Sequence, residues 1–229
     1  MGSVAIDKTR TAFLVIALFL CGCTYSMTVD PPLQQPPLLE PLPLTIGVYY
    51  NQDFKNYTHH QSVRGEQWQN SWDIELGSAS VKMFDLILPA MLDAVAVSDF
   101  PSLDQSPEDF ADVVAIVEPS IENFYLVDPG SPRMGFPPPL IKYTASISYR
   151  LTLYSPEGNV IVSKVYKGKG QLQHTHVSDA LSTWVKSIYS DVIKQAMREA
   201  AANILLDQQL QSSLQGLMSS NAYQKKVAP

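Results

Sequence analysis

Alternating apolar and polar residues in the second half of the chain predict its clearest strands. Over residues 143–153, apolar side chains at every second position alternate with Thr, Ser and Arg, which is the period of a half-buried strand. The sequence Ser-Pro-Glu-Gly-Asn at residues 155–159 is typical of a turn. Residues 160–169 are therefore predicted to return as the partner strand of a hairpin.

Two further strands are predicted earlier in the chain. Residues 44–50 alternate and are rich in β-branched and aromatic side chains. Residues 112–127 contain the continuous apolar run Val-Val-Ala-Ile-Val at 113–117, which is typical of a central strand covered on both faces. Pro119 interrupts this region, so either the strand pairing shifts there or one edge of the strand is free.

Apolar residues at helical spacing predict two helices. The first covers residues 78–97 and contains Pro89, which is expected to kink it. The second begins at Ser178, and its periodicity fades after Leu210. Residues 51–75 are polar and aromatic-rich, and we predict a long loop with room for one short strand near residues 72–76.

The order strand, helix, strand, strand, strand, helix predicts an α+β fold. A small mixed or antiparallel sheet would carry two helices packed mainly on one face. The length favours one domain, which we place at residues 44–210, followed by a flexible carboxyl-terminal tail at residues 211–229.

The amino terminus has the pattern of a secretory signal. A short segment carrying Lys8 and Arg10 precedes an apolar run at residues 11–20, which ends in Leu20-Cys21-Gly22-Cys23. The run is half of the roughly 20 residues that span a bilayer, so a permanent transmembrane helix is the weaker interpretation.

The four residues Leu20-Cys21-Gly22-Cys23 resemble the lipobox of bacterial lipoproteins. That resemblance implies that residues 1–22 are removed as a signal peptide and that Cys23 becomes the lipidated amino terminus. Thr24 in place of Asp implies the outer membrane, on its periplasmic face. The alternative is an ordinary signal peptide with a chance cysteine.

Prolines dominate the stretch that follows Cys23. Six of them lie between Pro31 and Pro43, and such a chain favours an extended, semi-rigid polyproline II conformation. We therefore predict that residues 23–43 form a tether that holds the domain a few tens of ångströms above the membrane. A docking peptide for a proline-binding partner is the alternative.

Charge and cysteine content narrow the functional classes. The net charge of −6 argues against nucleic acid as a partner and against adhesion to anionic headgroups. Cys21 and Cys23 are the only cysteines, so the processed chain would have no disulfide. The expected membrane attachment is the lipid on Cys23, and we expect no other cofactor.

Candidate catalytic and metal-binding residues are few. His174 and His176, with His59 or His60 nearby, could hold a metal, but two polar residues in a loop is the favoured interpretation. Glu118 and Glu122, with Asp112, could form paired carboxylates, although a solvated sheet edge is favoured. The chain contains no nucleotide-binding or hydrolase motif. We therefore expect a protein that is not an enzyme and has no metal site.

Large apolar residues in predicted loops are candidate protein contacts. Met134 and Phe136 lie among prolines, and Trp68 and Trp72 lie in the long polar loop. Aromatic and Met side chains are favoured as interface anchors. For the two tryptophans, folding back as a lid over the sheet is an equal alternative.

The overall layout resembles small periplasmic envelope lipoproteins such as LpoB, CsgG and the amino-terminal domain of TolB. The resemblance rests on residues 44–50, 111–117 and 143–166 and concerns layout alone. It implies an adaptor or assembly factor that binds an envelope protein. An auxiliary transport lipoprotein that binds a lipid, glycan or other small molecule is the alternative, and self-association into a homo-oligomer stays open.

Overall fold

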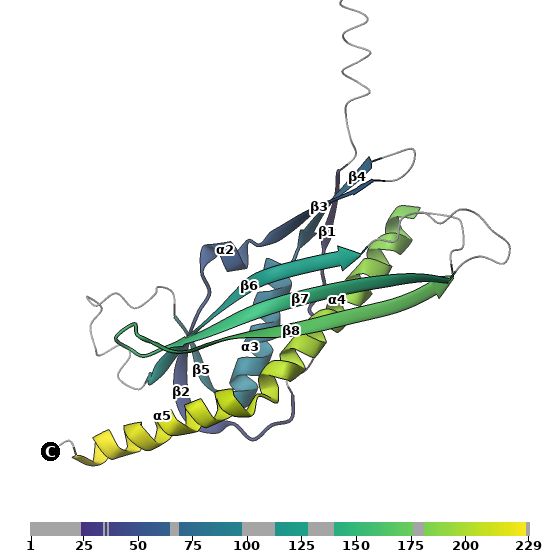
Figure 1. Cartoon of the computed structure of the whole chain (residues 1–229). Coiled ribbons are helices and arrows are strands. Elements are labelled where there is room, and N and C mark those ends of the chain that lie inside the picture. Colours follow the sequence, from purple (N-terminus) through teal and green to yellow (C-terminus); the bar gives the residue numbers. More distant parts are fainter. Residues whose placement is uncertain are drawn as a thin grey trace, which may run out of the picture.

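The computed structural model describes residues 24–33, 35, 37–64, 69–97, 113–127, 140–175 and 181–227. Its elements form two sheets and a layer of helices (Figure 1). In chain order they are β1 (Thr24–Thr28), β2 (Leu42–Tyr49), α2 (Gln52–Lys55), β3 (Thr58–Arg64), β4 (Gln69–Glu75), α3 (Gly77–Met91), β5 (Leu92–Val97), β6 (Ala115–Val127), β7 (Leu140–Tyr154), β8 (Val160–Thr175), α4 (Leu181–Leu205) and α5 (Gln208–Val227).

The larger sheet has five strands in the order β5-β2-β6-β7-β8. The predicted hairpin is confirmed as β7 and β8, which pair antiparallel from Leu140–Thr175 to Tyr154–Val160. Strand β2 is parallel to both of its neighbours, so the sheet is mixed. Helices α3 and α4 cover one face (Figure 1). The prediction of an α+β fold with two helices mainly on one face is confirmed.

Pro119 lies in the part of β6 that does not pair with β2. Strand β2 pairs with β6 only from Ala115 to Val117, whereas β7 pairs along β6 through Pro119 to Val127. Proline has no N–H to donate and is tolerated on a free strand edge. The described fold shows both features near this proline: β2 no longer pairs with β6 beyond Val117, and the β6–β7 register shifts between Ile121 and Asn123.

The smaller sheet replaces most of the predicted long loop. Its order is β1-β4-β3, with β3 and β4 antiparallel and β1 parallel to β4. The prediction of a loop over residues 51–75 was therefore wrong for the β3–β4 hairpin. Polar composition alone favours a loop here, but a sheet with an exposed face accepts polar side chains on that face.

The first predicted helix is shorter than expected. Helix α3 ends at Met91, and residues 92–97 form β5, which pairs parallel with β2. Pro89 lies in the last turn of the helix, which ends two residues later at Met91. The segment Leu-Asp-Ala-Val-Ala-Val is short and almost entirely apolar. Such a run fits a strand as well as a helix, and the pairing with β2 decides between them.

Helix α4 lies against β8 at very close range. A Cβ atom at Gly168 would lie 1.9 Å from the carbonyl oxygen of Ala196, and one at Gly170 would lie 1.9 Å from that of Val192. These two glycines therefore let the helix backbone approach the strand.

A polar stripe on α4 also satisfies the outer edge of β8. Glu199 and Gln195 accept hydrogen bonds from the backbone N–H groups of Lys169 and Gln171, at 2.9 and 3.2 Å. Asn203 donates to the carbonyl oxygen of Lys167 at 2.8 Å. Groups that would otherwise recruit another strand are thus already paired.

The carboxyl-terminal segment is helical in its described part. Helix α5 extends to Val227, and Leu210 and Leu214 are 6% and 1% exposed. The expectation of a flexible tail over residues 211–229 is corrected for residues 211–227. The cause is tertiary: Leu210 and Leu214 pack against the core, which a weak local pattern does not reveal.

Candidate functional site

The first ten described residues, 24–33, form a strap across the domain, which we call the amino-terminal strap. Its first half is β1, which pairs residue by residue with β4 from Thr24–Ser71 to Thr28–Glu75. Thr28 also donates its hydroxyl to the Glu75 carboxylate at 2.8 Å. The strap is therefore part of the fold from its first residue.

An aromatic stack fixes the start of the strap against α4. The Tyr25 ring stacks on Trp72 with centroids 5.3 Å apart. Trp72 meets Tyr189 of α4 edge to face at 5.3 Å, and Tyr189 meets Tyr143 of β7 at 5.9 Å. The stack joins both sheets and α4, and pairs of this kind add about 0.5–1.5 kcal/mol each beyond area burial.

Met27 and Val29 belong to the hydrophobic core. They are 4% and 2% exposed, and each contributes roughly 1.5–3 kcal/mol through burial. The alternation of Tyr25, Met27 and Val29 with Thr24, Ser26 and Thr28 is a strand signal in the sequence. The neighbouring prolines concealed it, so the prediction of a tether over residues 23–43 is corrected for the strap.

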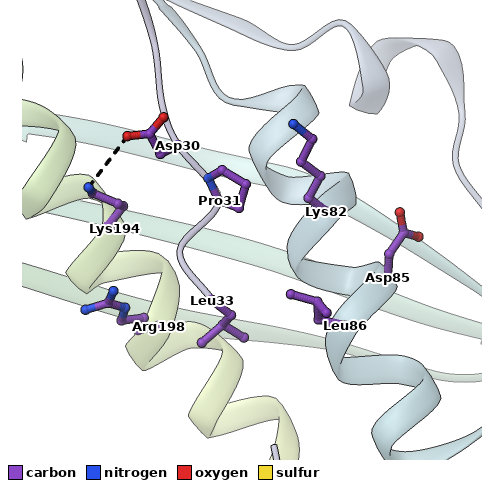
Figure 2. Close-up of a pocket in the computed structure, with 8 residues that line it drawn as sticks. All are labelled: Asp30, Pro31, Leu33, Lys82, Asp85, Leu86, Lys194 and Arg198. Atoms are coloured by element: carbon purple, nitrogen blue, oxygen red, sulfur yellow. Dashed lines mark ion pairs between the residues drawn. The ribbon is translucent and has the colours of Figure 1, made fainter. Parts of the chain in front are cut away.

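The second half of the strap runs between α3 and α4 (Figure 2). Arg198 donates its Nε–H to the carbonyl oxygen of the buried Pro32 at 2.6 Å. Lys194 lies 3.9 Å from the exposed Asp30 carboxylate and 3.0 Å from Asp191. The strong contact here is the hydrogen bond to the Pro32 carbonyl, whereas the exposed ion pair contributes little.

The strap and the two helices enclose an open groove of about 590 Å³. Figure 2 shows Leu33 and Leu86 directed toward each other in it. Its lining residues are Asp30, Pro31, Leu33, Lys82, Asp85, Leu86, Lys194 and Arg198. The groove is therefore mixed in character, with three cations and two carboxylates around apolar side chains.

One of the carboxylates that line the groove is already hydrogen-bonded within the fold. The Asp85 carboxylate accepts the Tyr50 hydroxyl at 2.8 Å. Burial, together with this hydrogen bond, raises the pKa of Tyr50 well above its usual range, so the phenol stays neutral and donates. Lys82 is exposed in the groove, so α3 contributes one cation and one carboxylate to its lining.

Trp72 lies in the interior. It is 5% exposed between Tyr25 and Tyr189. Trp72 therefore packs inside the fold as part of β4, and its described surroundings leave little of the side chain exposed for a protein partner. Trp68, Met134, Phe136 and the lipidation candidate Cys23 lie outside the described residues.

The described histidines do not form a shared site. The His59 ring packs edge to face on Phe124 at 4.8 Å, and burial lowers its pKa. His60 is exposed and bonds Asp73 at 2.8 Å. The His174 side chain and all of His176 are not described. Among the described residues, no three His, Cys, Asp or Glu side chains gather as metal ligands would.

The candidate carboxylates are separate and each is engaged. Glu118 accepts hydrogen bonds from Asn51 at 2.9 Å and from the Tyr154 hydroxyl at 3.0 Å. Glu122 pairs with Arg150 at 2.5 Å, which lowers the pKa of that carboxyl. Asp112 lies outside the described residues. In the described part of the fold, Glu118 and Glu122 therefore hold strands together and do not act as a pair.

A second cluster of charged groups holds the junction of α4 and α5. Asp207 accepts hydrogen bonds from Lys164 at 3.0 Å and from the Tyr166 hydroxyl at 2.5 Å, and it accepts the Gln209 N–H at the start of α5 at 3.0 Å. Burial alone would raise the pKa of Asp207, but these donors outweigh it and lower the pKa. Local sequence pattern does not reveal this cluster, because Lys164 and Tyr166 lie 43 and 41 residues before Asp207.

Comparison with known proteins leaves the family open. No protein-family model and no curated protein matches the chain. The fold is similar to the hypothetical protein CT253 from Chlamydia trachomatis, at 11% identity and a TM-score of 0.36 over 72% of this chain and 96% of that one. It is also similar to a neuraminyllactose-binding hemagglutinin homolog from Helicobacter pylori, at 9% identity and 0.41 over 80% and 96%. Scores this low support no functional conclusion.

No described helix is long and apolar enough to cross a membrane.

Proposed function

We propose that this chain is a lipid-anchored envelope protein that acts as a non-enzymatic adaptor or assembly factor. Cys23 carries the lipid, and the domain faces the periplasm from the outer membrane. One observation carries the proposal: β1 begins at Thr24, directly after Cys23, and is built into the fold. The residues that follow the proposed anchor are therefore held by the domain from Thr24 onward, which suits a protein that presents a surface near the membrane.

The described polar clusters support an adaptor more than a catalyst. Glu118, Glu122 and Asp207 each accept hydrogen bonds that join separate elements. Catalysis needs groups poised toward a substrate, whereas these are occupied within the fold. Leu206, which is 75% exposed at the junction of α4 and α5, is a candidate contact residue, and α5 itself leaves the domain at the end away from the start of β1 (Figure 1).

The lipid anchor is tested directly in cells. Metabolic labelling with an alkyne-bearing fatty acid should mark the protein, and Cys23→Ser should abolish both the label and membrane retention. Cys21→Ser is the matched control and should keep both. Labelling that persists in Cys23→Ser would contradict the assignment.

The adaptor role is tested by crosslinking in living cells. A photo-crosslinking residue placed at the 75% exposed Leu206 or at Met218 should capture one defined envelope protein. The crosslink should disappear in Cys23→Ser, because the adaptor must be at the membrane to meet its partner. A crosslink that is independent of Cys23, or recovery as a lone monomer at native abundance, would count against the proposal.

The groove favours a second candidate, an auxiliary transport lipoprotein that carries a small ligand. Its volume of about 590 Å³ lies within the range of ligand sites. Lys82, Lys194 and Arg198 would suit an anionic amphiphile such as a lipid headgroup with part of its chain. Native mass spectrometry of the processed protein would show such a ligand as a bound mass that Lys82→Gln weakens. An unliganded spectrum from freshly extracted membranes would remove this candidate.

A further inference from the structure

The larger sheet has an outer face on the side away from α3 and α4 (Figure 1). Gly168 and Gly170 of β8 lie against the backbone of α4. Successive side chains of a strand point to opposite faces, so Lys167 and Lys169 project from the outer face. Both lysines are exposed. The outer face therefore carries two cations side by side on β8.

Strand pairing arranges this part of the outer face in two rows across β6, β7 and β8. Tyr125, Ser146 and Lys169 form the first row, and Asn123, Ser148 and Lys167 form the second. The rows lie about 7 Å apart along the strands, and the ends of each row are about 10 Å apart across them. Each of these six residues, which we call the outer patch, is exposed or half-buried.

The outer patch concentrates positive charge. Among the described residues, no carboxylate forms an ion pair with Lys167 or Lys169. The carboxylate of Glu199 lies at this edge of β8, where it accepts the backbone N–H of Lys169 at 2.9 Å. The neighbouring Arg150 is paired with Glu122. Two lysines without an acidic partner, on a chain with a net charge of −6, therefore fit an anionic ligand.

The remaining side chains of the outer patch suit a sugar. Tyr125 is 59% exposed, and its ring combines an apolar face with a polar tip. The hydroxyls of Ser146 and Ser148 and the amide of Asn123 can each donate and accept hydrogen bonds. The C–H face of a sugar ring stacks on a phenol ring, and its hydroxyls bond to groups of this kind.

The outer patch offers side chains and not a strand edge. Strand β7 lies between β6 and β8, and the edge of β8 from Lys167 to Gln171 is bonded to side chains of α4. A peptide that extends a sheet needs free backbone N–H and C=O groups, whereas these groups of β8 are already bonded. An acidic glycan therefore fits the outer patch better than an acidic peptide.

We propose that the outer patch binds an extended glycan that carries carboxylates. One sugar ring packs on Tyr125, and its hydroxyls bond to the serine and asparagine side chains beside it. Lys167 and Lys169 pair with carboxylates along the glycan. This site lies on the opposite side of the sheet from the groove between α3 and α4, and it does not depend on the proposed lipid on Cys23.

Titration with defined glycans tests the site. The full chain in mild detergent is titrated by calorimetry with two carboxylate-bearing probes of different sugars, an oligogalacturonate and a hyaluronate oligosaccharide. At least one should bind, and its affinity should fall as the salt concentration rises. The methyl ester of the same glycan has the same backbone without the charge and should bind at least several-fold more weakly.

Variants assign the binding to the outer patch. Lys167→Gln/Lys169→Gln should weaken binding of the acidic glycan at least several-fold. Lys55→Gln/Lys82→Gln is the matched control, since it removes the same charge from exposed lysines on α2 and α3, and it should leave binding unchanged. Tyr125→Ser should also weaken binding, whereas Tyr125→Phe keeps the ring and should retain most of it. Urea denaturation checks that the variants are folded.

Four results would overturn the proposal. They are the absence of binding to both acidic glycans, equal binding of the methyl ester, an unchanged affinity in Lys167→Gln/Lys169→Gln, and an affinity for poly-L-glutamate as high as for the glycans. The last result would show attraction to carboxylates of any kind, including those of an acidic protein, without recognition of a sugar.

Discussion

The two terminal segments of the described chain, the amino-terminal strap and α5, are held in different ways. Nearly every residue of the strap contacts an element distant in sequence, through strand pairing with β4, the aromatic stack and the Arg198 hydrogen bond. The described side chains of helix α5 contact the core in its first three turns, at Leu210, Leu214, Leu217 and Met218, and the helix is also held through the Asp207 junction. The start of the chain is therefore fixed along its length, whereas α5 is fixed at its base.

This difference teaches that a segment's composition does not decide whether it belongs to the core. The strap is short and flanked by prolines, yet it completes a sheet. Helix α5 is long and has its own backbone hydrogen bonds, and the core contacts of its described side chains lie in its first three turns. Stability measurements on matched positions can sharpen or break the comparison.

Trp72→Ala should have the largest effect. It removes the side chain that joins β1, β4 and α4, and loss of a buried aromatic residue costs about 3–5 kcal/mol. Urea denaturation measures the change in the free energy of unfolding. Trp72→Phe keeps an aromatic ring and should recover much of the loss. A change below about 1 kcal/mol in Trp72→Ala would show that the strap is not tied to the core.

Leu214→Ala should come next and tests the base of α5. The residue is 1% exposed, so its truncation should cost about 2–4 kcal/mol. Leu206→Ala is the matched control, since Leu206 is 75% exposed, and it should stay within about 0.5 kcal/mol of the unchanged chain. Equal small effects at the two leucines would support the predicted flexible tail over residues 211–229.

Asp207→Asn should cost about 1.5–3 kcal/mol at neutral pH, because hydrogen bonds to a charged group are lost. The pKa of Asp207 is lowered from 3.8 in the folded state. The stability that it supplies is therefore present above that ordinary value and is lost as the pH falls through the lowered pKa.

The pH dependence gives this substitution its own check. The difference in unfolding free energy between the unchanged chain and Asp207→Asn should be constant near neutrality and should shrink below about pH 4. A difference that grows on acidification would contradict the role of Lys164 and Tyr166 as donors to a carboxylate.

Arg198→Met should have the smallest measurable effect, about 1 kcal/mol, because it leaves the buried Pro32 carbonyl without its donor. The methionine keeps much of the apolar stem. Asp30→Asn is the control, since an exposed pair at 3.9 Å from Lys194 contributes little. Urea denaturation measures both effects. A larger loss of stability in Asp30→Asn than in Arg198→Met would show that the ion pair with Lys194, and not the Arg198 hydrogen bond, holds the strap.

Sequence periodicity predicted the elements whose partners are close in the chain. The β7–β8 hairpin followed from alternation and a turn, and α3 and α4 from apolar residues at helical spacing. The free edge and the pairing shift expected at Pro119 both occur close to it, the shift between Ile121 and Asn123. These features depend on local pattern and on short loops.

The candidate site was much less predictable. Trp72 was identified as important, but neither its burial nor its partners followed from the loop prediction. Arg198 and Pro32 are 166 residues apart, and no spacing rule joins them. For Cys23 the sequence says more than the structure. Its proposed role comes from a local motif, and its position lies outside the described residues.

The sequence by itself determined the α+β class, the main hairpin and the two covering helices, because side-chain periodicity is a local property of strands and helices. Only the tertiary structure decided that the residues after Cys23 form a strand, that Trp72 is buried and that α5 is anchored at its base. Each of these depends on a partner surface that forms when distant segments meet, and the free energy of burial on that surface outweighs local composition.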